Sequence, residues 1–488
     1  MSHPLLPGFN PDPSVVRVGT DYYLVTSSFE YLPGLPVHHS TDLRTWRQIG
    51  HVATRPGQVQ LDRVPTPGGV WAPTLRYRHG VFHLIVTVFL GGRGCVVFTA
   101  TDPAGPWSDG VTIPAVDGID PDLVWDEDGT AIVTFARHPD PIQQVRVDLS
   151  TGEALEVPRA IWPGSGLYSP EGPHLYHRGE WWYLVVAEGG TDRGHAVTVA
   201  RAPRPEGPFE SCPANPVLTA SGTGSPVQNL GHADLVETDE GTALVCLGVR
   251  PVGLAQSFSP LGRETFLGTV DWVDGWPRPR LADLPPSMEE ADYDFTEASA
   301  FSDPVWIAVR RPATEFARTA SGGLLISSAG STGLDGTHPA FLGRRQRHLT
   351  ATVGAVFDVS AGAGGLAVRN AEDNSIALEA RTSAGGVEIT ARAVVAGFDR
   401  SWHATLPAGE VELTVTMTPP PADFSAGAVG GDRIRLTARS ADTEVTLTEL
   451  DGRHWCFETA KAFTGRVIGP FASEGHVIVR RLHYSGHG

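Results

Sequence analysis

One sequence pattern occurs five times in the first 280 residues of the chain. Each copy has a short strand-like run, a turn that contains glycine, and a second, strongly apolar run. The copies open near Asp12, Ala72, Asp120, Glu171 and His232, and their second runs start at Asp21, Val81, Thr130, Trp181 and Thr242. A repeat of about 50 to 60 residues is typical of a four-stranded propeller blade with its loops. We therefore predict a five-bladed β-propeller over residues 1–280. A β-sandwich with accidentally similar hairpins is the alternative, and five ordered copies with matching turns count against it.

The repeat stops at the acidic, proline-containing segment 281–290, which we interpret as a linker. Beyond it, apolar and polar residues alternate in several runs, which begin at Leu349, Val411, Ile434 and Val445. Alternation with period two indicates strands with one buried and one wet face. Residues 291–488 are therefore predicted to form an antiparallel β-sandwich, and the whole chain to be all-β.

Composition excludes several classes of partner. The net charge of -18 argues against binding to nucleic acid or to an anionic membrane surface, because polyanions are bound by basic patches. The sequence contains no apolar run long enough for a transmembrane helix and no recognisable leader peptide. The four cysteines lack metal-ligand spacing, and a chain of 488 residues does not need disulfides. We expect a cytoplasmic protein, and the sequence leaves homo-oligomer formation open.

Three of the five repeat openings carry a carboxylic acid: Asp12, Asp120 and Glu171. In a propeller, equivalent positions converge on the central channel, so these acids are predicted to meet in one pocket. Three carboxyl groups with few compensating cations are costly unless they serve binding or catalysis. Each acid alone has an ordinary explanation, since aspartate before proline is a common turn opener. Their equivalence across the repeats is what indicates a function.

Other chemistries have little support in the sequence. It contains no P-loop, no Gly-x-Ser-x-Gly elbow, no His-Glu-x-x-His motif and no Cys-x-x-Cys pair. His232 opens the fifth repeat, and we interpret it as a structural hydrogen-bonding residue in preference to a direct metal ligand.

Several motifs together resemble glycoside hydrolase family 43, and in particular its two-domain β-xylosidases and α-L-arabinofuranosidases. They are Pro7-Gly-Phe-Asn-Pro-Asp-Pro-Ser14, Trp71-Ala-Pro, Gly118-Ile-Asp-Pro-Asp122, Pro170-Glu-Gly-Pro-His-Leu-Tyr176, Gly231-His-Ala-Asp-Leu, Leu261-Gly-Arg-Glu-Thr265 and Phe463-Thr-Gly-Arg-Val-Ile-Gly-Pro-Phe471. The resemblance extends over both predicted domains. It implies a five-bladed propeller and an inverting mechanism.

The resemblance also implies roles for the three acids. Asp12 is similar to the general base and Glu171 to the general acid. Asp120 is similar to the third acid, which raises the pKa of the acid and holds it in place. For inversion, the carboxyl groups of Asp12 and Glu171 should lie about 6.5–9.5 Å apart, which leaves room for the attacking water.

Further residues are implied to bind the sugar. Arg263 resembles an arginine that contacts sugar hydroxyls, with Arg250 as a second candidate. Phe29 and Trp71 resemble the aromatic walls of the subsite for the terminal sugar. His232 resembles a channel histidine that faces a hydrated calcium ion in some relatives. The chemistry itself needs no cofactor, and the resemblance allows for a structural calcium ion in the channel, reached from His232 through water.

We therefore predict an inverting exo-glycosidase that removes terminal non-reducing β-D-xylosyl residues from short xylo-oligosaccharides. An α-L-arabinofuranosidase, or an enzyme with both activities on arabinose-decorated xylan or arabinan oligosaccharides, is the alternative. A non-catalytic sugar-binding propeller is the rival from another class. That rival predicts the replacement of at least one acid, and all three are present.

Overall fold

The computed structural model describes residues 3–254, 257–421 and 429–488. They form two compact units. The propeller unit contains the residues up to Leu6, Asn10–Val249 and Glu264–Pro285. The sandwich unit contains Pro7–Phe9, Arg250–Arg263 and Pro286–Gly488. Each unit is described separately below.

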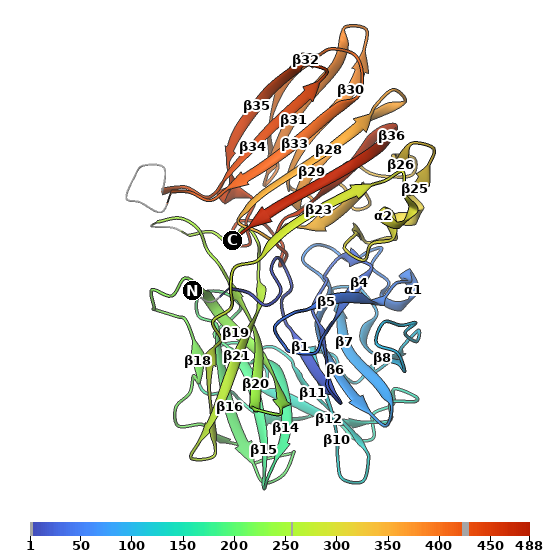
Figure 1. The fold of residues 1–488 in the computed structure, drawn as a ribbon. Helices are drawn as coiled ribbons and strands as arrows, with labels where there is room; N and C mark the ends of the chain where they lie inside the picture. Colours follow the sequence, from blue (N-terminus) through green and yellow to red (C-terminus); the bar gives the residue numbers. More distant parts are fainter. Residues whose placement is uncertain (1–2, 255–256, 422–428) are drawn as a thin grey trace. The chain divides into compact units, whose positions relative to one another are not determined.

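Among the described residues, the propeller unit has five antiparallel sheets, in chain order from blue to yellow-green in Figure 1. In each sheet the strands are hydrogen-bonded in sequence order, with the short β3 (Tyr31–Leu32) in the connection between β2 and β4. The first sheet comprises β1 (Ser14–Val18), β2 (Asp21–Val25), β4 (Gly34–Ser40) and β5 (Arg47–Ala53). The second comprises β6 (Gly69–Arg78), β7 (Val81–Phe89), β8 (Gly94–Ala100) and β9 (Val111–Thr112). The third comprises β10 (Ile119–Trp125), β11 (Ala131–Ala136), β12 (Ile142–Val147) and β13 (Arg159–Trp162). The fourth comprises β14 (Glu171–Arg178), β15 (Trp181–Glu188), β16 (Ala196–Ala202) and β17 (Glu210–Ser211), with β18 (Leu218–Thr219) also pairing with β16. The fifth comprises β19 (Gln228–Thr238), β20 (Gly241–Val249), β21 (Glu264–Val273) and β22 (Trp276–Leu281).

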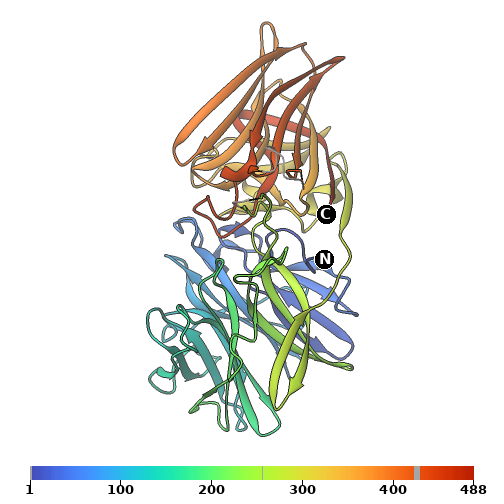
Figure 2. The same ribbon diagram turned by 90° about the vertical axis from the view of Figure 1, so that its left-hand side faces the viewer.

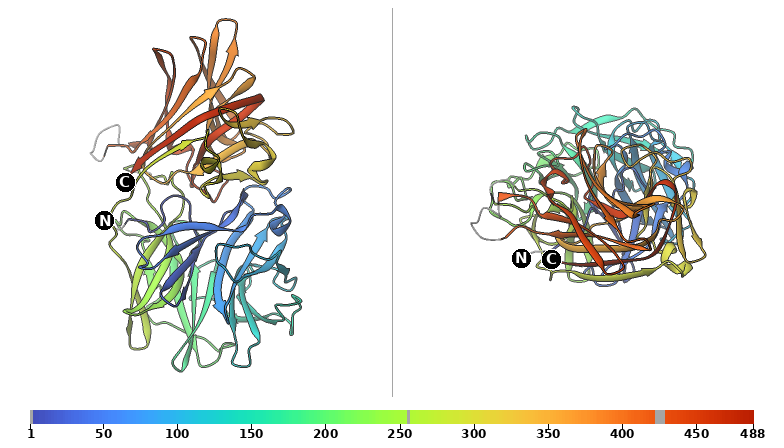
Figure 3. Two further views of the ribbon diagram at one scale, coloured as in Figure 1. Left: turned by 45° about the vertical axis from the view of Figure 1, so that its right-hand side comes forward. Right: turned by 90° about the horizontal axis from the view of Figure 1, so that it is seen from above.

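The apolar cores of the propeller lie between neighbouring blades. One cluster joins the first and second blades, and others join the second to the third, the third to the fourth, and the fourth to the fifth. A further cluster packs Val15 and Leu24 of the first blade against Val245 and Leu267 of the fifth. The ring is thereby closed, and the predicted five-bladed propeller is confirmed. The blade strands can be followed around it in the two views of Figure 3.

The N-terminal segment helps to close this ring. The backbone N–H groups of Leu5 and Leu6 donate to the carbonyl oxygen of Thr265 in β21, at 2.7 and 3.2 Å. The hydroxyl of Thr265 donates to the carbonyl oxygen of Asn10 at 2.5 Å. The strand that leads to Asp12 is therefore tied to the last blade before the first blade begins.

A ring of polar side chains forms hydrogen bonds between the innermost strands of neighbouring blades. One residue in each innermost strand lies two positions after Asp12, Ala72, Asp120, Gly172 or His232, and the five are Ser14, Thr74, Asp122, His174 and Asp234. Each next residue is apolar, and its backbone N–H donates to a side chain of the preceding blade at four of the five junctions. These four bonds are Val15 to Asp234 (3.0 Å), Leu75 to Ser14 (2.9 Å), Leu175 to Asp122 (2.9 Å) and Leu235 to the Tyr176 hydroxyl (2.8 Å).

Arg76 of β6 completes the ring at the remaining junction. Its guanidinium donates to Asp122 at 2.6 Å and to Asp234 at 3.1 Å, and it lies 3.1 Å from a ring nitrogen of His174. Burial alone would raise the pKa of Asp234, but Arg76 lowers it to about 2. One buried cation thus compensates two buried carboxylates, as buried charges require.

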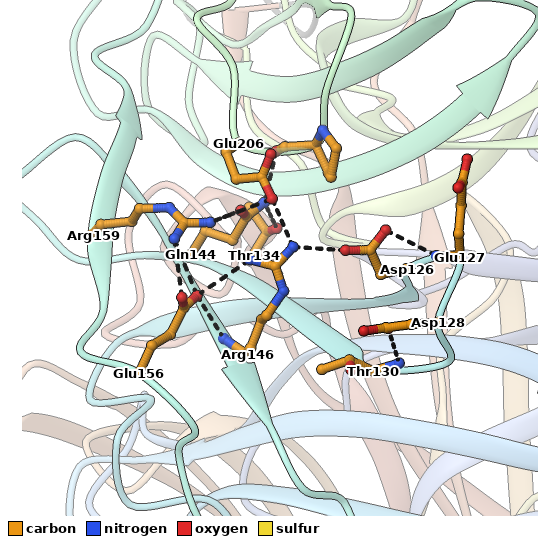
Figure 4. A network of polar contacts seen from close by, with 11 residues as sticks. Asp126, Glu127, Asp128, Thr130, Thr134, Gln144, Arg146, Glu156, Arg159 and Glu206 are labelled. Atoms are coloured by element: carbon orange, nitrogen blue, oxygen red, sulfur yellow. Dashed lines mark hydrogen bonds and ion pairs between the residues drawn. The ribbon is translucent and has the colours of Figure 1, made fainter.

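A second polar network, shown in Figure 4, lies nearer the surface of the third and fourth blades. Arg146 of β12 contacts Asp126 and Glu206, each at 2.6 Å, and Arg159 of β13 contacts Glu156 at 3.1 Å. Glu206 lies between β16 and β17, so the network links neighbouring blades. Its side chains are partly exposed, and such pairs stabilise a fold weakly compared with the buried ring.

The sandwich unit contains two antiparallel sheets that share β36 (Val467–His487), the long red strand of Figure 1. In one sheet β36 pairs with β23 (Met288–Asp294), β26 (Gly323–Ser327) and β28 (Thr350–Asp358). That sheet continues with β25 (Ala317–Ala320) beside β26, and with β33 (Val411–Thr418), β34 (Arg433–Ser440) and β35 (Thr443–Asp451) beyond β28. In the other sheet β36 pairs with β27 (Ala340–Arg345) and β29 (Gly362–Ala371). That sheet continues with β24 (Ile307–Val309) beside β27, and with β30 (Asn374–Ser383), β31 (Gly386–Val395) and β32 (Phe398–Leu406) beyond β29.

Both sheets contribute to one apolar core in the sandwich unit. Val353 and Leu413 come from the first sheet, and Leu366 and Leu378 from the second. Residues of β28 alternate between buried and half-buried, as the period-two pattern predicts. The orange and red strands of this core can be followed in Figure 2.

The remaining elements are short. They are α1 (Pro56–Val59), α2 (Ala298–Ser302) and the 3-10 turns η1 (Ala313–Glu315) and η3 (Gly452–His454). All four cysteines are buried and unpaired with one another. None of the described helices has the length and apolar character needed to cross a membrane. The segment 281–290, which we interpreted as a linker, overlaps two strands. Leu281 is the last residue of β22, and Met288 is the first residue of β23.

Candidate active site

Equivalent positions at the start of the innermost strands share an unusual backbone conformation. Asp12, Asp120 and His232 have φ angles of 55°, 54° and 47°, and Gly172 in the fourth blade has 57°. In three blades the pairing register shifts beside these residues, between β10 and β11, between β14 and β15, and between β19 and β20. A left-handed conformation is uncommon outside glycine, and its recurrence marks sites where the surrounding structure imposes it. The same left-handed backbone conformation therefore orients the residue at this position in four of the five blades.

Gly172 shows why the fourth blade carries its acid one position earlier, at Glu171. A Cβ atom on Gly172 would lie 2.8–3.1 Å from three ring atoms of His232. The imidazole thus packs directly on the Gly172 backbone and leaves no room for a side chain there. On its other side, His232 Nδ1 lies 3.7 Å from an Asp12 carboxylate oxygen.

Asp120 contacts the same backbone unit. Its carboxylate accepts a hydrogen bond of 3.1 Å from the N–H of Gly172, the residue directly after Glu171. Glu171 itself is partly buried, and its carboxylate lies 3.5 Å from His138 Nε2. Asp12, Asp120, Glu171 and His232 are therefore brought together around Gly172. The three acids are thus linked through Gly172 and His232, and their roles in the chemistry stay predictions.

Ser27, at the beginning of the connection that follows β2, holds Asp12. Its hydroxyl donates to the Asp12 carboxylate at 2.6 Å, and its backbone N–H donates to the carbonyl of Pro11 at 3.2 Å. Both Ser27 and Asp12 are buried. One carboxylate oxygen of Asp12 is thus fixed by a hydroxyl, and a hydrogen bond donated to a carboxylate favours its ionised form.

Replacing Ser27 by alanine tests this contact. We expect kcat/KM at neutral pH to fall about 10-fold, which is the worth of one hydrogen bond to a charged group. The acidic limb of the pH profile should move to higher pH, because the ionised form of Asp12 loses a donor. Ser28→Ala, in which the neighbouring hydroxyl that accepts from Leu35 N–H is lost instead, is the matched control. An unchanged acidic limb in Ser27→Ala would contradict the assigned contact.

His232 is neutral at physiological pH. Burial lowers the pKa of His232 to about 4, against an opposing effect of the Asp12 carboxylate and with a further lowering by His174. The His195 ring packs on the backbone of Gly231, the residue before His232, since a Cβ atom on Gly231 would lie 2.0 Å from it. The imidazole therefore contributes shape and hydrogen bonding beside Asp12 and adds no positive charge to the three acids.

The two predicted aromatic walls lie close together in the chain's fold. Phe29 and Val70 exchange two backbone hydrogen bonds of 2.9 Å, which places Phe29 next to the residue before Trp71. Trp71 is half-buried, and its ring lies 4.6 Å from that of Phe89. The Phe29 side chain is 1% exposed, so it presents little surface. Trp71 has the larger surface available for a ligand.

Arg263 belongs to the sandwich unit by its contacts. Its side chain is buried, lies over the rings of Phe457 and Phe463, and reaches the carbonyl oxygen of Phe463 at 3.5 Å. Arg250 is also buried and belongs to this unit. The structure therefore assigns Arg263 to a different compact unit from the three acids, which the linear motif did not indicate.

The channel residues do not fit a directly bound calcium ion. Hard cations take several oxygen ligands, and the carboxylates of Asp122 and Asp234 are already engaged by Arg76. Across the described ranges, no group of three histidine, cysteine, aspartate or glutamate side chains is arranged to hold a metal ion.

Comparison with known proteins identifies the family. The model of glycosyl hydrolases family 43 matches residues 1–277, which is more than half of the chain. The chain belongs to glycosyl hydrolase family 43. A second model, the concanavalin A-like C-terminal domain of β-xylosidases, matches residues 292–477. Both units are thus accounted for, and the resemblance inferred from the motifs is confirmed.

Individual relatives within family 43 cover most of the chain. A non-reducing end α-L-arabinofuranosidase from Bacteroides ovatus is 36% identical over 96% of this chain and 91% of its own. A xylosidase/arabinosidase from Butyrivibrio fibrisolvens is 36% identical over 71% of this chain and 72% of its own. The crystal structure of a xylan β-1,4-xylosidase from Bacillus halodurans is 28% identical. It superimposes with a TM-score of 0.87 over 99% of this chain and 100% of the other.

Some residues of this family 43 site were missed by the sequence reasoning. The polar ring of Ser14, Thr74, Asp122, His174 and Asp234 had a visible signal, because every repeat carries a polar residue at that position. Ser27 and His138 had no such signal in the sequence. Ser27 contacts Asp12 and His138 contacts Glu171, and both come from connections that lie outside the repeated pattern. Only the folded chain brings them to the acids.

Proposed function

We propose that the protein is an inverting exo-glycosidase that removes terminal β-D-xylosyl residues from short xylo-oligosaccharides. The observation that carries the proposal is the meeting of three carboxylates around Gly172. Asp120 binds the Gly172 N–H, Glu171 precedes it, and His232 packs on it while touching Asp12. Two of these acids suffice for glycoside hydrolysis, and the third can orient one of them.

In the proposed reaction, Asp12 removes a proton from a water molecule that attacks the anomeric carbon. Glu171 delivers a proton to the glycosidic oxygen as that bond breaks, so the leaving sugar departs as an alcohol. Asp120 holds the backbone next to Glu171 and so orients the acid. Inversion requires a water-sized gap between the carboxyl groups of Asp12 and Glu171, about 6.5–9.5 Å.

We assign sugar binding to Trp71 as an apolar wall, to His232 as a neutral hydrogen-bonding wall, and to Arg263 from its motif. The half-buried Trp71 has the surface that stacking on a sugar ring needs. The proposed substrate is a small, neutral oligosaccharide. Its binding needs no basic patch, so it is compatible with the net charge of -18. A cytoplasmic location stays a prediction, and cell fractionation tests it.

An α-L-arabinofuranosidase, alone or with β-xylosidase activity, is the second candidate. The observation that favours it is the name of the Bacteroides ovatus relative, which covers nearly the whole chain and is described as an arabinofuranosidase. The Butyrivibrio relative is named for both activities. The two pentoses offer similar hydroxyl groups to one pocket, which supports dual activity.

Proton NMR of the first product tests substrate and stereochemistry together. With 4-nitrophenyl β-D-xyloside, we expect α-xylose to appear first and then mutarotate, because single displacement inverts the anomeric carbon. 4-Nitrophenyl α-L-arabinofuranoside is run beside it, and the ratio of kcat/KM values ranks the two activities. First appearance of β-xylose would overturn the inverting mechanism. The absence of turnover with both substrates and with arabino- and xylo-oligosaccharides would favour the non-catalytic sugar-binding propeller.

A further inference from the structure

A loop of residues 163–170 joins β13 to β14, whose first residue is the proposed general acid. Two neighbouring residues, Glu188 at the end of β15 and Gly189 directly after it, contact this loop at two points. The backbone N–H of Ser165 donates to both carboxylate oxygens of Glu188, each at 3.0 Å. The backbone N–H of Gly189 donates to the carbonyl oxygen of Tyr168 at 2.7 Å. The loop is therefore fastened to the end of the strand that pairs with β14.

Glu188 is a fully buried carboxylate, with 0% of its surface exposed. Its Oε2 atom also accepts a hydrogen bond of 2.5 Å from the hydroxyl of Thr198 on β16, which is itself fully buried. A carboxylate in such a place is costly unless donors reach its oxygen atoms. Because the Ser165 N–H is one of these donors, the carboxylate and the loop stabilise each other.

Gly164 relays this contact to the residue before the acid. A Cβ atom on Gly164 would lie 2.4 Å from a carboxylate oxygen of Glu188 and 3.5 Å from the Cβ atom of Pro170. The backbone of Gly164 thus lies against both the carboxylate and Pro170, which directly precedes Glu171. Gly164 also has a φ of 94°, which favours glycine. The beginning and the end of the loop therefore meet beside Glu188.

The sheet alone gives Glu171 limited support. Glu171 pairs with Ala187, and the register shifts before the next pair at His174. Two positions before Glu171, Ser169 has a φ of 52°. This left-handed conformation is uncommon outside glycine, so the surrounding structure imposes it. The contacts of the loop therefore help to fix the direction in which the chain enters Glu171.

We propose that Glu188 is a positioning residue for the general acid Glu171. By accepting from Ser165 and packing against Gly164, its carboxylate fixes the loop that enters Glu171. The acid is thereby held where it can protonate the leaving oxygen, and a misplacement of about 1 Å can cost about 10²-fold in rate. The inference rests on the proposed function, in which Glu171 is the general acid, and it concerns residues of the propeller unit alone.

The test compares kcat/KM for xylobiose, whose leaving sugar needs a proton, with that for 4-nitrophenyl β-D-xyloside, whose aryl group needs little protonation. Glu188→Ala should lower the value for xylobiose about 10-fold and that for the aryl xyloside less than about 2-fold. Gly164→Ala should give the same pattern, because its methyl group would push the loop off the carboxylate without changing the core of the blade. Glu188→Gln keeps an oxygen that accepts from Ser165 and should stay within about 3-fold of the parent on both substrates. In a Glu171→Gln background, neither Glu188→Ala nor Gly164→Ala should lower xylobiose hydrolysis further.

Two changes in the same blade are the matched controls. Glu210→Ala removes a carboxylate of β17 that lies 3.6 Å from Arg201. Gly179→Ala adds a methyl group to a left-handed glycine in the turn between β14 and β15, where no other atom lies within 4 Å of the new Cβ. Both controls should leave kcat/KM for both substrates unchanged.

Three results would overturn the proposal. They are equal losses with the two substrates in Glu188→Ala and Gly164→Ala, which a merely structural role predicts; unchanged rates in both variants; and a further loss in the Glu171→Gln background.

Failure of the proposed function would be seen separately, as absence of turnover by the parent. Hydrogen–deuterium exchange of the peptide 163–171 then decides whether Glu188 positions this segment. Faster exchange in Glu188→Ala than in Glu210→Ala supports the hold on the loop, and equal exchange in the two variants overturns it.

Discussion

Replacing Asp12 by asparagine is expected to lower kcat by about 10²- to 10⁴-fold for every glycoside that the protein hydrolyses. The amide cannot accept a proton from the attacking water, whatever the leaving group. Because Asp12 is buried and its carboxylate accepts from Ser27, the isosteric amide should keep the local packing. Asp21→Asn, on β2 of the same blade and paired with His39, is the control and should leave kcat unchanged.

The matching change at Glu171 separates the two roles. Glu171→Gln should reduce the hydrolysis rate of xylobiose by about 10²-fold or more, because the xylose unit that leaves is a poor leaving group. It should affect the hydrolysis of 4-nitrophenyl xyloside much less. An aryl leaving group needs little protonation, whereas a sugar alkoxide needs a full proton. Glu180→Gln, an exposed residue in the turn between β14 and β15, is the control. Equal losses with both substrates in Glu171→Gln, or leaving-group dependence in Asp12→Asn, would reverse or refute the assignment.

The second large effect is expected in stability, at the polar ring of the propeller channel. Asp234→Asn should lower the free energy of unfolding of the propeller unit by about 3–5 kcal/mol. Asp234 is fully buried and accepts from Arg76, from the Ser14 hydroxyl, from the Val15 N–H and from the Tyr176 hydroxyl. An amide there removes a charge that Arg76 needs, and it places N–H donors where these groups already donate.

The pH dependence of this contribution has a definite sign. The folded-state pKa of Asp234 is about 2, below the ordinary value of 3.8, after the cost of burial is outweighed by Arg76. A lowered pKa stabilises the fold above about pH 3.8, and this stabilisation is lost as the pH falls toward 2. The difference in stability between the parent and Asp234→Asn should therefore shrink in strong acid.

Differential scanning calorimetry of the full chain measures this effect in the propeller transition. The matched control is Asp239→Asn, in the fifth blade like Asp234, which breaks the exposed pair of Asp239 with Arg17 of the first blade and should leave the unfolding temperature nearly unchanged. If Asp234→Asn unfolded at the same temperature as Asp239→Asn, the ring of channel contacts would have no role in closing the propeller.

The repeat predicted much of the fold because it is a local pattern. Each copy combines a glycine turn with a buried second strand, and this pattern predicts a hairpin. Five such hairpins in order along the chain predict a closed ring. The sandwich strands were predicted from period-two alternation for the same reason. The sharing of β36 by two sheets was not predictable, because nothing local shows where a 21-residue strand passes from one sheet to the other.

The candidate site divides in the same way. Asp12, Asp120 and His232 were predicted to converge from their equivalent places in the repeat, and they share one left-handed backbone conformation. The offset of Glu171 was visible in the sequence, but its cause was not. The cause is the His232 ring, which comes from a strand 60 residues later and occupies the space beside Gly172.

By itself, the sequence determined the all-β architecture and the five blades, since these follow from short-range periodicity, and it predicted the three acids from the equivalence of repeats. The tertiary structure decided the contacts around those acids, with Ser27 on Asp12 and His232 on Gly172, and it decided the separate pairing of Arg76 with Asp122 and Asp234 in the channel. It also decided that Arg263 is held among sandwich residues. The physical reason is that such contacts join residues distant in sequence, and a chain's local pattern carries no information about which distant side chain will fill a given space.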